Sequence, residues 1–342
     1  MLEELRLINR MKPQTKRILG DDVQKIFITG GSGFIGSHVC DLLLSQNYDV
    51  TIYDNFSNGR REFTIHHLIN PRFKLVEADC LDLDRLNKEM VGHDLVWHLA
   101  ANTDIVGSHT QPDRDLKDCV VATFNVLEGM RQNKIIPILF ASSGAVYGKL
   151  CLEDHVDESA GPLAPMSTYA AGKIGSEAFI YCYCHLYGIR GWMFRFGNVI
   201  GSRVTHGVLY DFINRLNTNP NELLILGDGT QEKNYFLTEE CIEGMAWSFL
   251  NSKLDEQNPC AVYNLGTASV TPVTEIAKIV VEEMGLTDKT KISIEGKKYA
   301  WLGDQPKVHL SVDKVNSEGW HCRNSSNEAV RVAVRRILGM TK

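Results

Sequence analysis

Short apolar runs alternate with amphipathic stretches over the first two hundred residues of the chain. Six of these runs, bounded by polar and turn residues, have the length of buried strands. Amphipathic patterns typical of helices fall between most of them, and this alternation predicts right-handed crossovers and a buried parallel sheet. The expected strands are residues 25–29, 49–54, 73–77, 94–100, 138–142 and 191–196, and the clearest helices are 35–45, 113–132 and 168–187.

The pattern changes after Gly197. Turn-rich segments at 217–221 and 227–229 alternate with short helical patterns, and two strand patterns appear at 223–226 and 261–265. We expect a smaller α/β lobe that packs over the carboxyl edge of the parallel sheet, where α/β folds bind ligands. The predicted division is an N-terminal extension at 1–22, a sheet domain at 23–200 to which segments at about 233–265 return, and a lobe that takes up most of 201–342.

The composition is that of an ordinary globular protein, with 44% hydrophobic and 23% charged residues. The formal net charge of −6 argues against nucleic acid or an anionic membrane surface as the main partner. No apolar run approaches the ~20 residues that span a bilayer, and residues 1–22 lack the apolar core of a signal peptide. Nine cysteines without a CxxC pair predict reduced thiols in a cytoplasmic protein, and no metal site is predicted.

A glycine-rich turn follows the first expected strand. Gly30, Gly33 and Gly36 give the spacing GxxGxxG between that strand and the helix at 35–45. The first glycine permits a tight turn, the second lets a pyrophosphate approach the backbone, and the third lets the helix pack against the strand. With a strand before it and a helix after it, the turn predicts dinucleotide binding and a doubly wound, Rossmann-type sheet.

Two carboxylates end the next two expected strands. Asp54 lies where a side chain can accept hydrogen bonds from both ribose hydroxyls and repel a 2′-phosphate, which favours NAD over NADP. Asp79 is placed to meet the adenine amino group. The alternative for Asp54 is that it caps a loop together with Asn55.

Tyr169 and Lys173 are four positions apart at the start of the helix expected at 168–187. Residues at this spacing share one helix face, so the ammonium can lie beneath the phenol and lower the phenol's pKa. Such a phenol can take a proton from a sugar hydroxyl as hydride leaves the adjacent carbon. Ser143 follows the fifth expected strand, which places its hydroxyl at the carboxyl edge of the sheet beside Tyr169. Its alternative role is that of a turn or helix cap.

Seven short motifs stand in the order and spacing of the extended short-chain dehydrogenases/reductases: GGSGFIG, YDN, HLAAN, SSGAVYG, YAAGK, RFGNVIG and GDGT. From about residue 23 to its end, the chain resembles the branch of NAD-dependent sugar-nucleotide epimerases and dehydratases, and it is most similar to UDP-glucose 4-epimerase-like proteins. The resemblance implies NAD as the cofactor and a nucleotide sugar, most often UDP-linked, as the substrate.

The resemblance also implies a role for each matching residue. Tyr169 would be the base, Lys173 its electrostatic partner and a ligand of ribose, and Ser143 a hydrogen-bond partner of the reacting oxygen. Asn198 and Lys233 would contact the diphosphate of the substrate, and Asp304 would lie near its nucleotide. The cofactor would contact Gly30, Gly33, Phe34, Ile35, Gly36, Asp54, Asn55, Asp79, Cys80, Leu99, Ala100, Ala101, Thr103, Tyr169, Lys173, Phe196 and Val199.

Three positions depart from the family pattern. Cys119 stands where the family often has an asparagine, and Trp301 stands where the 4-epimerases carry an arginine. Lys233 replaces an arginine after the GDGT motif, which exchanges a bidentate fork for a point charge. Lys297 or Lys298 is the alternative source of the diphosphate contact that Trp301 cannot make.

The two residues after Ser143 discriminate between the reactions of this branch. The 4,6-dehydratases carry carboxylates there and the uronic-acid decarboxylases a glutamate, whereas this chain has Gly144 and Ala145, which neither donate nor accept a proton. The 3,5-epimerases need a cysteine acid, which the motif lacks. The interpretation is 4-epimerisation of a UDP-hexose with NAD regenerated in each cycle. Another reaction of the branch (dehydration, decarboxylation, another epimerisation or reduction) and a non-catalytic NAD-binding regulator remain open.

The helix expected at 168–187 carries more apolar surface than one packed face requires, including Phe179, Tyr181 and Leu186. By resemblance, this helix and the helix at 113–132 form a four-helix interface in a homodimer. The alternative is that the N-terminal extension covers this surface.

Overall fold

The computed structural model describes residues 17–152, 155–301 and 303–340. Its largest layer is a seven-stranded parallel sheet with the order β11-β6-β5-β4-β1-β2-β3. The predicted α/β fold with a doubly wound parallel sheet is therefore confirmed. The strands are β1 (Lys25–Thr29), β2 (Asp49–Asp54), β3 (Phe73–Glu77), β4 (Leu95–His98), β5 (Pro137–Ala141), β6 (Arg190–Phe196) and β11 (Cys260–Leu265).

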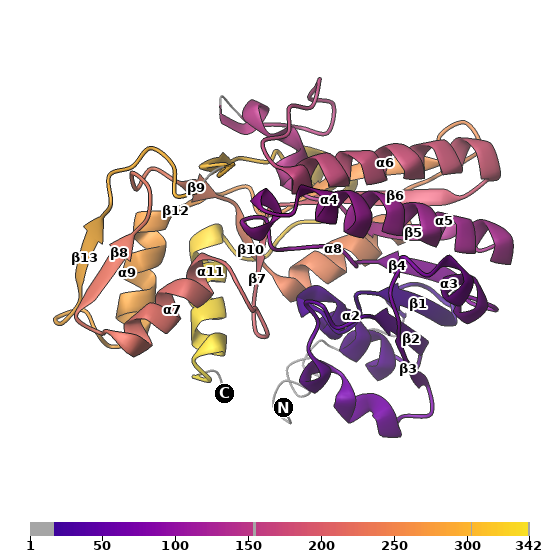
Figure 1. Ribbon diagram of the computed structural model, residues 1–342, viewed down its shortest axis with the longest axis horizontal. Helices are drawn as coiled ribbons and strands as arrows, with labels where there is room; N and C mark the ends of the chain where they lie inside the picture. The colour runs from indigo at the N-terminus through magenta and orange to yellow at the C-terminus, as the bar shows by residue number, and fades with distance from the viewer. Residues whose placement is uncertain (1–16, 153–154, 302, 341–342) are drawn as a thin grey trace.

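Each face of the sheet has its own apolar core. Ile26 and Ile28 of β1 point into one core, and Phe27 between them points into the other. The first core packs against α2 (Phe34–Ser45) and α8 (Thr238–Asn251). The second packs against α3 (Leu83–Glu89), α5 (Ala122–Asn133) and α6 (Thr168–Tyr187), and α5 and α6 run side by side along it (Figure 1). Burial on both faces explains the nearly continuous apolar runs of the central strands.

The helix expected at 113–132 is interrupted. It begins as α4 (Pro112–Asp115), widens into a π-helical turn at Leu116–Val121 and continues as α5. The widened turn packs against α6 at Gly172, where a Cβ would lie 2.9 Å from Cys119 Cβ. The carbonyl of Cys119 accepts a hydrogen bond from Ser176 of α6 at 3.1 Å. The π-helical turn is therefore accompanied by a polar contact between two helices. The periodicity of apolar residues does not predict such a contact.

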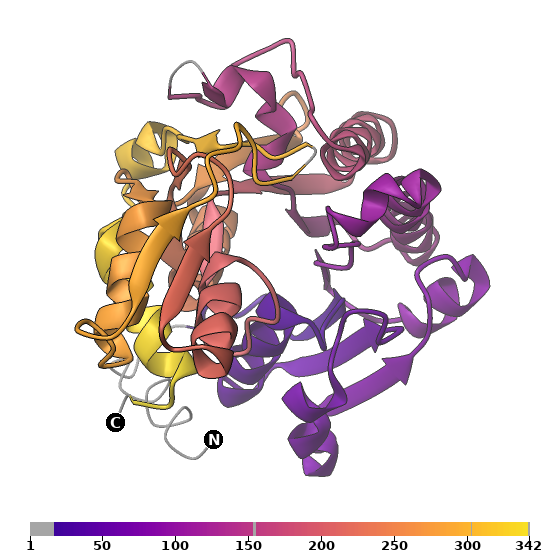
Figure 2. The ribbon, with the colours of Figure 1, turned by 60° about the vertical axis from the view of Figure 1, so that its left-hand side comes forward.

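The smaller lobe occupies the left side of Figure 1. Its core lies between helices α7, α9 and α11 and the parallel pair β8 and β13, which run side by side in Figure 2. Short strands join it to the sheet domain, since β7 pairs with β10 and β9 lies between β12 and β14. The bounds are β7 (Asn198–Ile200), α7 (Val208–Thr218), β8 (Glu222–Ile225), β9 (Glu232–Lys233), β10 (Tyr235–Leu237), β12 (Thr271–Pro272), α9 (Val273–Glu283), β13 (Lys291–Ile294), β14 (Lys307–Val308), α10 (Asp313–Glu318) and α11 (Ser326–Ile337).

Only the end of the expected N-terminal extension falls within the described residues, and residues 1–16 lie outside them. Ile18 and Leu19 are buried in the first core, and the Arg17 guanidinium lies 3.7 Å from the centre of the Tyr48 ring. All nine cysteines are free thiols and most are buried, as predicted. Among the helices that the structure describes, none is long and apolar enough to cross a membrane.

Candidate active site

The glycine turn after β1 leaves no room for side chains. Gly30 has a φ of +69°, and a Cβ on it would lie 2.7 Å from the backbone nitrogen of Ala100. A Cβ on Gly36 would lie 2.2 Å from the Gly30 carbonyl oxygen. Gly33 is the N-cap of α2 and makes no side-chain cap, so the first N–H groups of the helix are not capped by a side chain. The turn therefore offers an anion an approachable backbone and a helix N-terminus.

Asp54 and Asp79 lie beside this turn, as the sequence predicted for the ends of β2 and β3. Asp54 Oδ2 accepts a hydrogen bond from Ser32 N and Oδ1 accepts one from Phe56 N, both at 2.8 Å. Burial raises the pKa of Asp54, and the two backbone hydrogen bonds oppose that rise. Asp79 accepts from Asn55 Nδ2 at 2.8 Å, which joins the two strand ends.

The remaining residues predicted to contact the cofactor surround the same edge of the sheet. Ala100 follows β4 and donates its N–H to Thr29 Oγ1 at 3.3 Å, and Leu99 N donates to the Thr29 carbonyl. Thr103 is exposed. The others are Phe34 and Ile35 at the start of α2, buried Cys80 after β3, half-buried Ala101 after β4, Phe196 at the end of β6, and Val199 in β7.

The structure brings Ser143, Tyr169 and Lys173 together at the start of α6. Ser167 caps this helix and accepts from Ala170 N, in the turn that the sequence predicted before Tyr169. Ser143 accepts from Ala145 N at 3.2 Å and also hydrogen-bonds the Tyr169 phenol, so it has both of the roles considered for it. Lys173 Nζ lies 5.8 Å from the centre of the Tyr169 ring.

The expected lowering of the Tyr169 pKa by Lys173 is wrong for this arrangement. Burial raises the pKa of Tyr169 above its ordinary value, and only the hydrogen bond with Ser143 works against this rise. Lys173 is directed elsewhere, because its ammonium donates to the Ala141 carbonyl at 2.6 Å. Burial also lowers the pKa of Lys173. Desolvation therefore outweighs the pairing that the helical spacing suggested.

A chain of neutral hydrogen bonds runs from β1 to α6. Thr29 Oγ1 lies 2.6 Å from His98 Nδ1, and His98 Nε2 lies 3.0 Å from Thr123 Oγ1. Thr123 donates to Ser176 Oγ, which donates to the Gly172 carbonyl, each at 3.0 Å. The Thr123 hydroxyl donates its one hydrogen to Ser176, so its oxygen must accept a hydrogen bond from His98. This assigns the imidazole proton of His98 to Nε2. Burial lowers the pKa of His98 to about 3, so this imidazole is neutral.

An ionic network supports the other side of the same helix. Arg195 of β6 donates to both carboxylate oxygens of Glu177 on α6, at 3.0 and 2.7 Å. Ser142 donates to the same carboxylate, and Arg195 also donates to the Tyr147 hydroxyl at 3.0 Å. Tyr147 in turn donates to Asn264 Oδ1 at 2.7 Å. The network therefore fixes both ends of the segment that carries Ser143.

A buried carboxylate holds the start of α6 against α4. Asp115 accepts from Thr168 Oγ1 at 2.6 Å and from Asn102 Nδ2 at 2.8 Å, and it is fully buried. Sequence reasoning missed this residue and both networks. Two signals were available: Glu177 shares a helix face with Lys173, and Arg195 is a lone charge in an apolar strand, which requires a buried partner.

The residues predicted to bind the substrate lie where the lobe meets the sheet. Asn198 hydrogen-bonds the Tyr235 phenol across the β7–β10 pair. Lys233 Nζ lies 3.8 Å from Asp304 Oδ1 and 5.7 Å from the centre of the Trp301 ring. Burial lowers the pKa of Lys233, and Asp304 opposes this shift. Asp304 Oδ1 is buried without a hydrogen-bond partner among the described residues, so an acceptor is available here.

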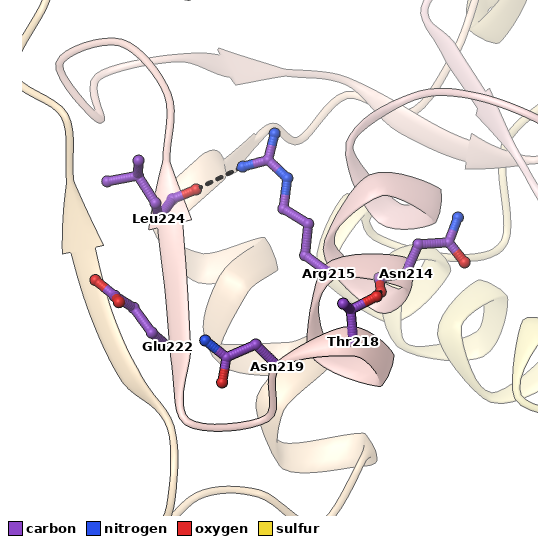
Figure 3. A pocket seen from close by; sticks show the side chains of 6 residues that line it. All are labelled: Asn214, Arg215, Thr218, Asn219, Glu222 and Leu224. Carbon is purple, nitrogen blue, oxygen red and sulfur yellow. Dashed lines mark hydrogen bonds between the residues drawn. The ribbon is translucent and has the colours of Figure 1, made fainter.

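A surface pocket of about 500 Å³ lies on the lobe between α7 and β8 (Figure 3). It is lined by polar residues of the α7 end, and Arg215 crosses it to donate to the Leu224 carbonyl at 3.0 Å. None of the predicted site residues lines this pocket. The candidate active site is therefore the edge of the sheet.

Comparisons with known proteins show the family to which the chain belongs. The model of the NAD dependent epimerase/dehydratase family matches residues 26–266, from β1 to the end of β11. The chain belongs to this family. It is an enzyme of the NAD-dependent sugar-nucleotide epimerase/dehydratase class, and NAD is its cofactor.

Individual relatives span most of the chain. A Methanocaldococcus jannaschii protein named "Putative UDP-glucose 4-epimerase" is 34% identical over 90% of this chain and 97% of its own length. A crystal structure of a UDP-galactose 4-epimerase is 35% identical, with a TM-score of 0.79 over 93% of this chain and 100% of that chain. UDP-glucuronic acid decarboxylase 4 of Arabidopsis thaliana is 29% identical over 76% of this chain and 57% of its own length.

The residues at the sheet edge fit NAD. The glycine turn would collide with any added Cβ, yet it leaves the N-terminus of α2 open to a pyrophosphate. The Asp54 carboxylate has acceptor capacity beyond its two backbone hydrogen bonds, which suits a pair of ribose hydroxyls.

Proposed function

We propose that this enzyme epimerises C4 of a UDP-hexose by transient oxidation to a 4-keto sugar. The observation that carries the proposal is the juxtaposition of Ser143 and Tyr169 at the end of β5, with no acidic or basic side chain at the two positions after Ser143. The positions that supply such groups in dehydratases and decarboxylases are Gly144 and Ala145 here. Similarity to proteins named as UDP-sugar 4-epimerases supports the same reaction.

The packing around Gly144 supports the absence of an extra carboxylate. A Cβ on Gly144 would lie 2.9 Å from the Phe196 carbonyl oxygen and 3.1 Å from Leu310 Cδ1. An acidic side chain therefore has no room at this position. Ala145 is half-buried and uses its N–H to hold Ser143.

The proposed roles follow from the site geometry. Tyr169 takes the proton of the C4 hydroxyl, and Ser143 donates to or accepts from the same oxygen as its charge changes. Lys173 would help to hold the cofactor's ribose, as the family resemblance implies. When bound, NAD supplies the hydride acceptor and returns the hydride. Lys173 is buried and Tyr169 is half-buried beside it.

At the other end of the substrate, Asn198 and Lys233 contact the diphosphate in this proposal. Lys233 is held by Asp304 and lies beside Trp301, so a half-buried cation would face the anion. Lys297 is already paired with Glu295 at 2.5 Å, which makes it a poor substitute for the missing arginine. We expect binding of the substrate's diphosphate to depend strongly on Lys233.

We also propose that the enzyme acts as a homodimer through α5 and α6. The outer surface of α6 exposes Phe179, Tyr181, Leu186 and Tyr187, and Val121 is exposed on the neighbouring π-helical turn. Exposed apolar residues gathered on adjacent helices are typical of a protein interface. Light scattering after size exclusion would give the dimer mass, and Leu186→Glu should give the monomer mass; a monomeric wild type would contradict the proposal.

An NMR assay tests the reaction. The purified protein is given UDP-glucose, UDP-N-acetylglucosamine, UDP-glucuronate, a GDP-sugar and a dTDP-sugar, without added reductant. The C4 epimer of a UDP-sugar is the expected product, and Tyr169→Phe should lower its rate by about 10²–10⁴-fold.

Other products would replace the proposal. A 4-keto product would indicate a dehydratase. Loss of CO₂ from UDP-glucuronate would indicate a decarboxylase, the reaction of one curated relative. No turnover of any donor, with NAD bound, would favour a non-catalytic regulator.

A further inference from the structure

Behind the cofactor turn, two imidazoles and a carboxylate converge from different elements. Asp41 lies in the second half of α2, and His66 and His67 lie in the short 3₁₀ helix Ile65–Ile69. Asp41 Oδ1 is 2.6 Å from His67 Nε2 and 3.6 Å from His66 Nε2. All three atoms lie within 4.8 Å of one another.

This donor set has the chemistry of a transition-metal site. Two imidazoles and one carboxylate are ligands that Zn²⁺ and related dications take in proteins, with water in the remaining positions. Tetrahedral ligands about 2.05 Å from a metal lie roughly 3.3 Å apart. The two measured separations bracket that value.

An ion would take the place of the short contact between Asp41 Oδ1 and His67 Nε2, in which the imidazole N–H donates to the carboxylate. Metal binding would therefore displace that proton.

The surroundings orient the ligands and leave a route to solvent. Arg203 Nη2 contacts Asp41 Oδ2 at 2.7 Å, which leaves Oδ1 for an ion. Such a contact to a ligating carboxylate is usual around metal sites. The nearby His38 is occupied by the Ser202 carbonyl at 3.0 Å. His66 is 26% exposed, whereas the Asp41 side chain is 5% exposed, so an ion would enter past His66.

We propose that Asp41, His66 and His67 bind a divalent transition metal such as Zn²⁺. The Arg203 charge opposes a dication, so the affinity should be lower than that of an isolated set of two histidines and an aspartate. The ion would fasten the Ile65–Ile69 helix to α2. Thr64, just before that helix, lies 3.1 Å from Ser32 Oγ in the cofactor turn, so the metal would also stiffen the turn.

Titration with Co²⁺ alone tests the proposal and needs neither NAD nor a sugar. We expect one equivalent of Co²⁺ to bind with visible d–d absorption and without a thiolate charge-transfer band, and Zn²⁺ to displace it. His66→Asn should weaken binding at least about tenfold. His321→Asn, which replaces an exposed histidine outside the cluster, should bind as the wild type does.

Because His66 is partly exposed, its replacement should leave the urea midpoint of the metal-free protein near that of the wild type, which keeps the comparison valid. The proposal is overturned if the wild type binds no Co²⁺, if thiolate bands appear, or if His66→Asn binds unchanged. In each of those cases the cluster is an Asp41–His67–Arg203 hydrogen-bonded contact only. None of these results bears on the epimerase proposal.

Discussion

Two buried networks hold α6, and they differ in kind. The chain from Thr29 through His98 to Ser176 is made of hydroxyls and a neutral imidazole. The network around Glu177 and Arg195 is ionic. The neutral chain ends near the cofactor turn, and the ionic network ends on the segment that carries Ser143.

This difference has an energetic meaning. A neutral hydrogen bond in the interior contributes only a modest net stability, about 0.5–1.5 kcal/mol. A buried ion pair depends on both partners, because either charge left alone in the interior is strongly destabilising. We therefore infer that the cofactor side of α6 tolerates change, while the strand-end serine segment depends on one ion pair.

Breaking the ionic network should have the largest effect. Arg195→Met leaves the Glu177 carboxylate buried without its cation and should lower the free energy of unfolding by about 3–5 kcal/mol, measured by urea titration. Replacing Glu177 by Met as well should recover much of this loss. A loss below about 1 kcal/mol in the single variant would show that Ser142 and solvent satisfy the carboxylate, and the contrast drawn here would fail.

A break in the neutral chain should cost less. Thr123→Val keeps the shape of the side chain but removes the acceptor of the His98 Nε2–H, and it should cost about 1–3 kcal/mol of unfolding free energy. The same urea titration measures it. An effect as large as that of Arg195→Met would mean that charge is not what separates the two networks.

The neutral chain should also make the stability of the folded protein depend on pH. His98 has a pKa of about 3 in the folded protein against an ordinary value of 6.5, so between these values the unfolded chain holds a proton that the native state lacks. Stability should therefore rise with pH over this window, by up to about 1.4 kcal/mol per unit for this one group. His98→Gln should reduce the slope measured between pH 5 and 6.5, whereas an unchanged slope would place the titration elsewhere. His93, with a pKa lowered to about 4 by burial, contributes in the same direction in both proteins.

The smallest effect should come from an exposed ion pair. Lys117 contacts Asp113 at 2.8 Å on the surface, and both side chains are more than half exposed. Lys117→Met should leave the urea midpoint unchanged, because solvent screens such pairs. A clear shift would show that charge matters in this protein whether or not it is buried.

Much of the fold followed from the sequence because local patterns encode it. The strand runs, the glycine turn and the helix that carries Tyr169 and Lys173 each depend on neighbouring residues, and the structure has these elements where they were expected. The π-helical turn escaped prediction because the contacts that accompany it, with Gly172 and Ser176, are made by residues far along the chain. The pKa of Tyr169 was predicted in the wrong direction because helical spacing reports proximity, whereas burial dominates the shift.

The networks and the proposed metal site could not be derived from the sequence, because each depends on residues that only the fold brings together. The apolar residues around Arg195 in the sequence predict that its charge has a buried partner. They do not predict that this partner is Glu177. Asp41 and His66 belong to separate elements, and no motif spacing links them. For this reason the sequence predicted no metal site at all.

The edge strand β11 has a consequence for how the protein is made. It pairs with β6, yet the chain between residues 197 and 259 runs through much of the lobe before β11 is reached. While the chain is being synthesised, one edge of β6 therefore has no partner strand until residue 265 has emerged from the ribosome. An open edge of this kind invites pairing with other chains. The sheet can be completed only once this part of the lobe has been made, so the two parts of the molecule cannot mature one after the other.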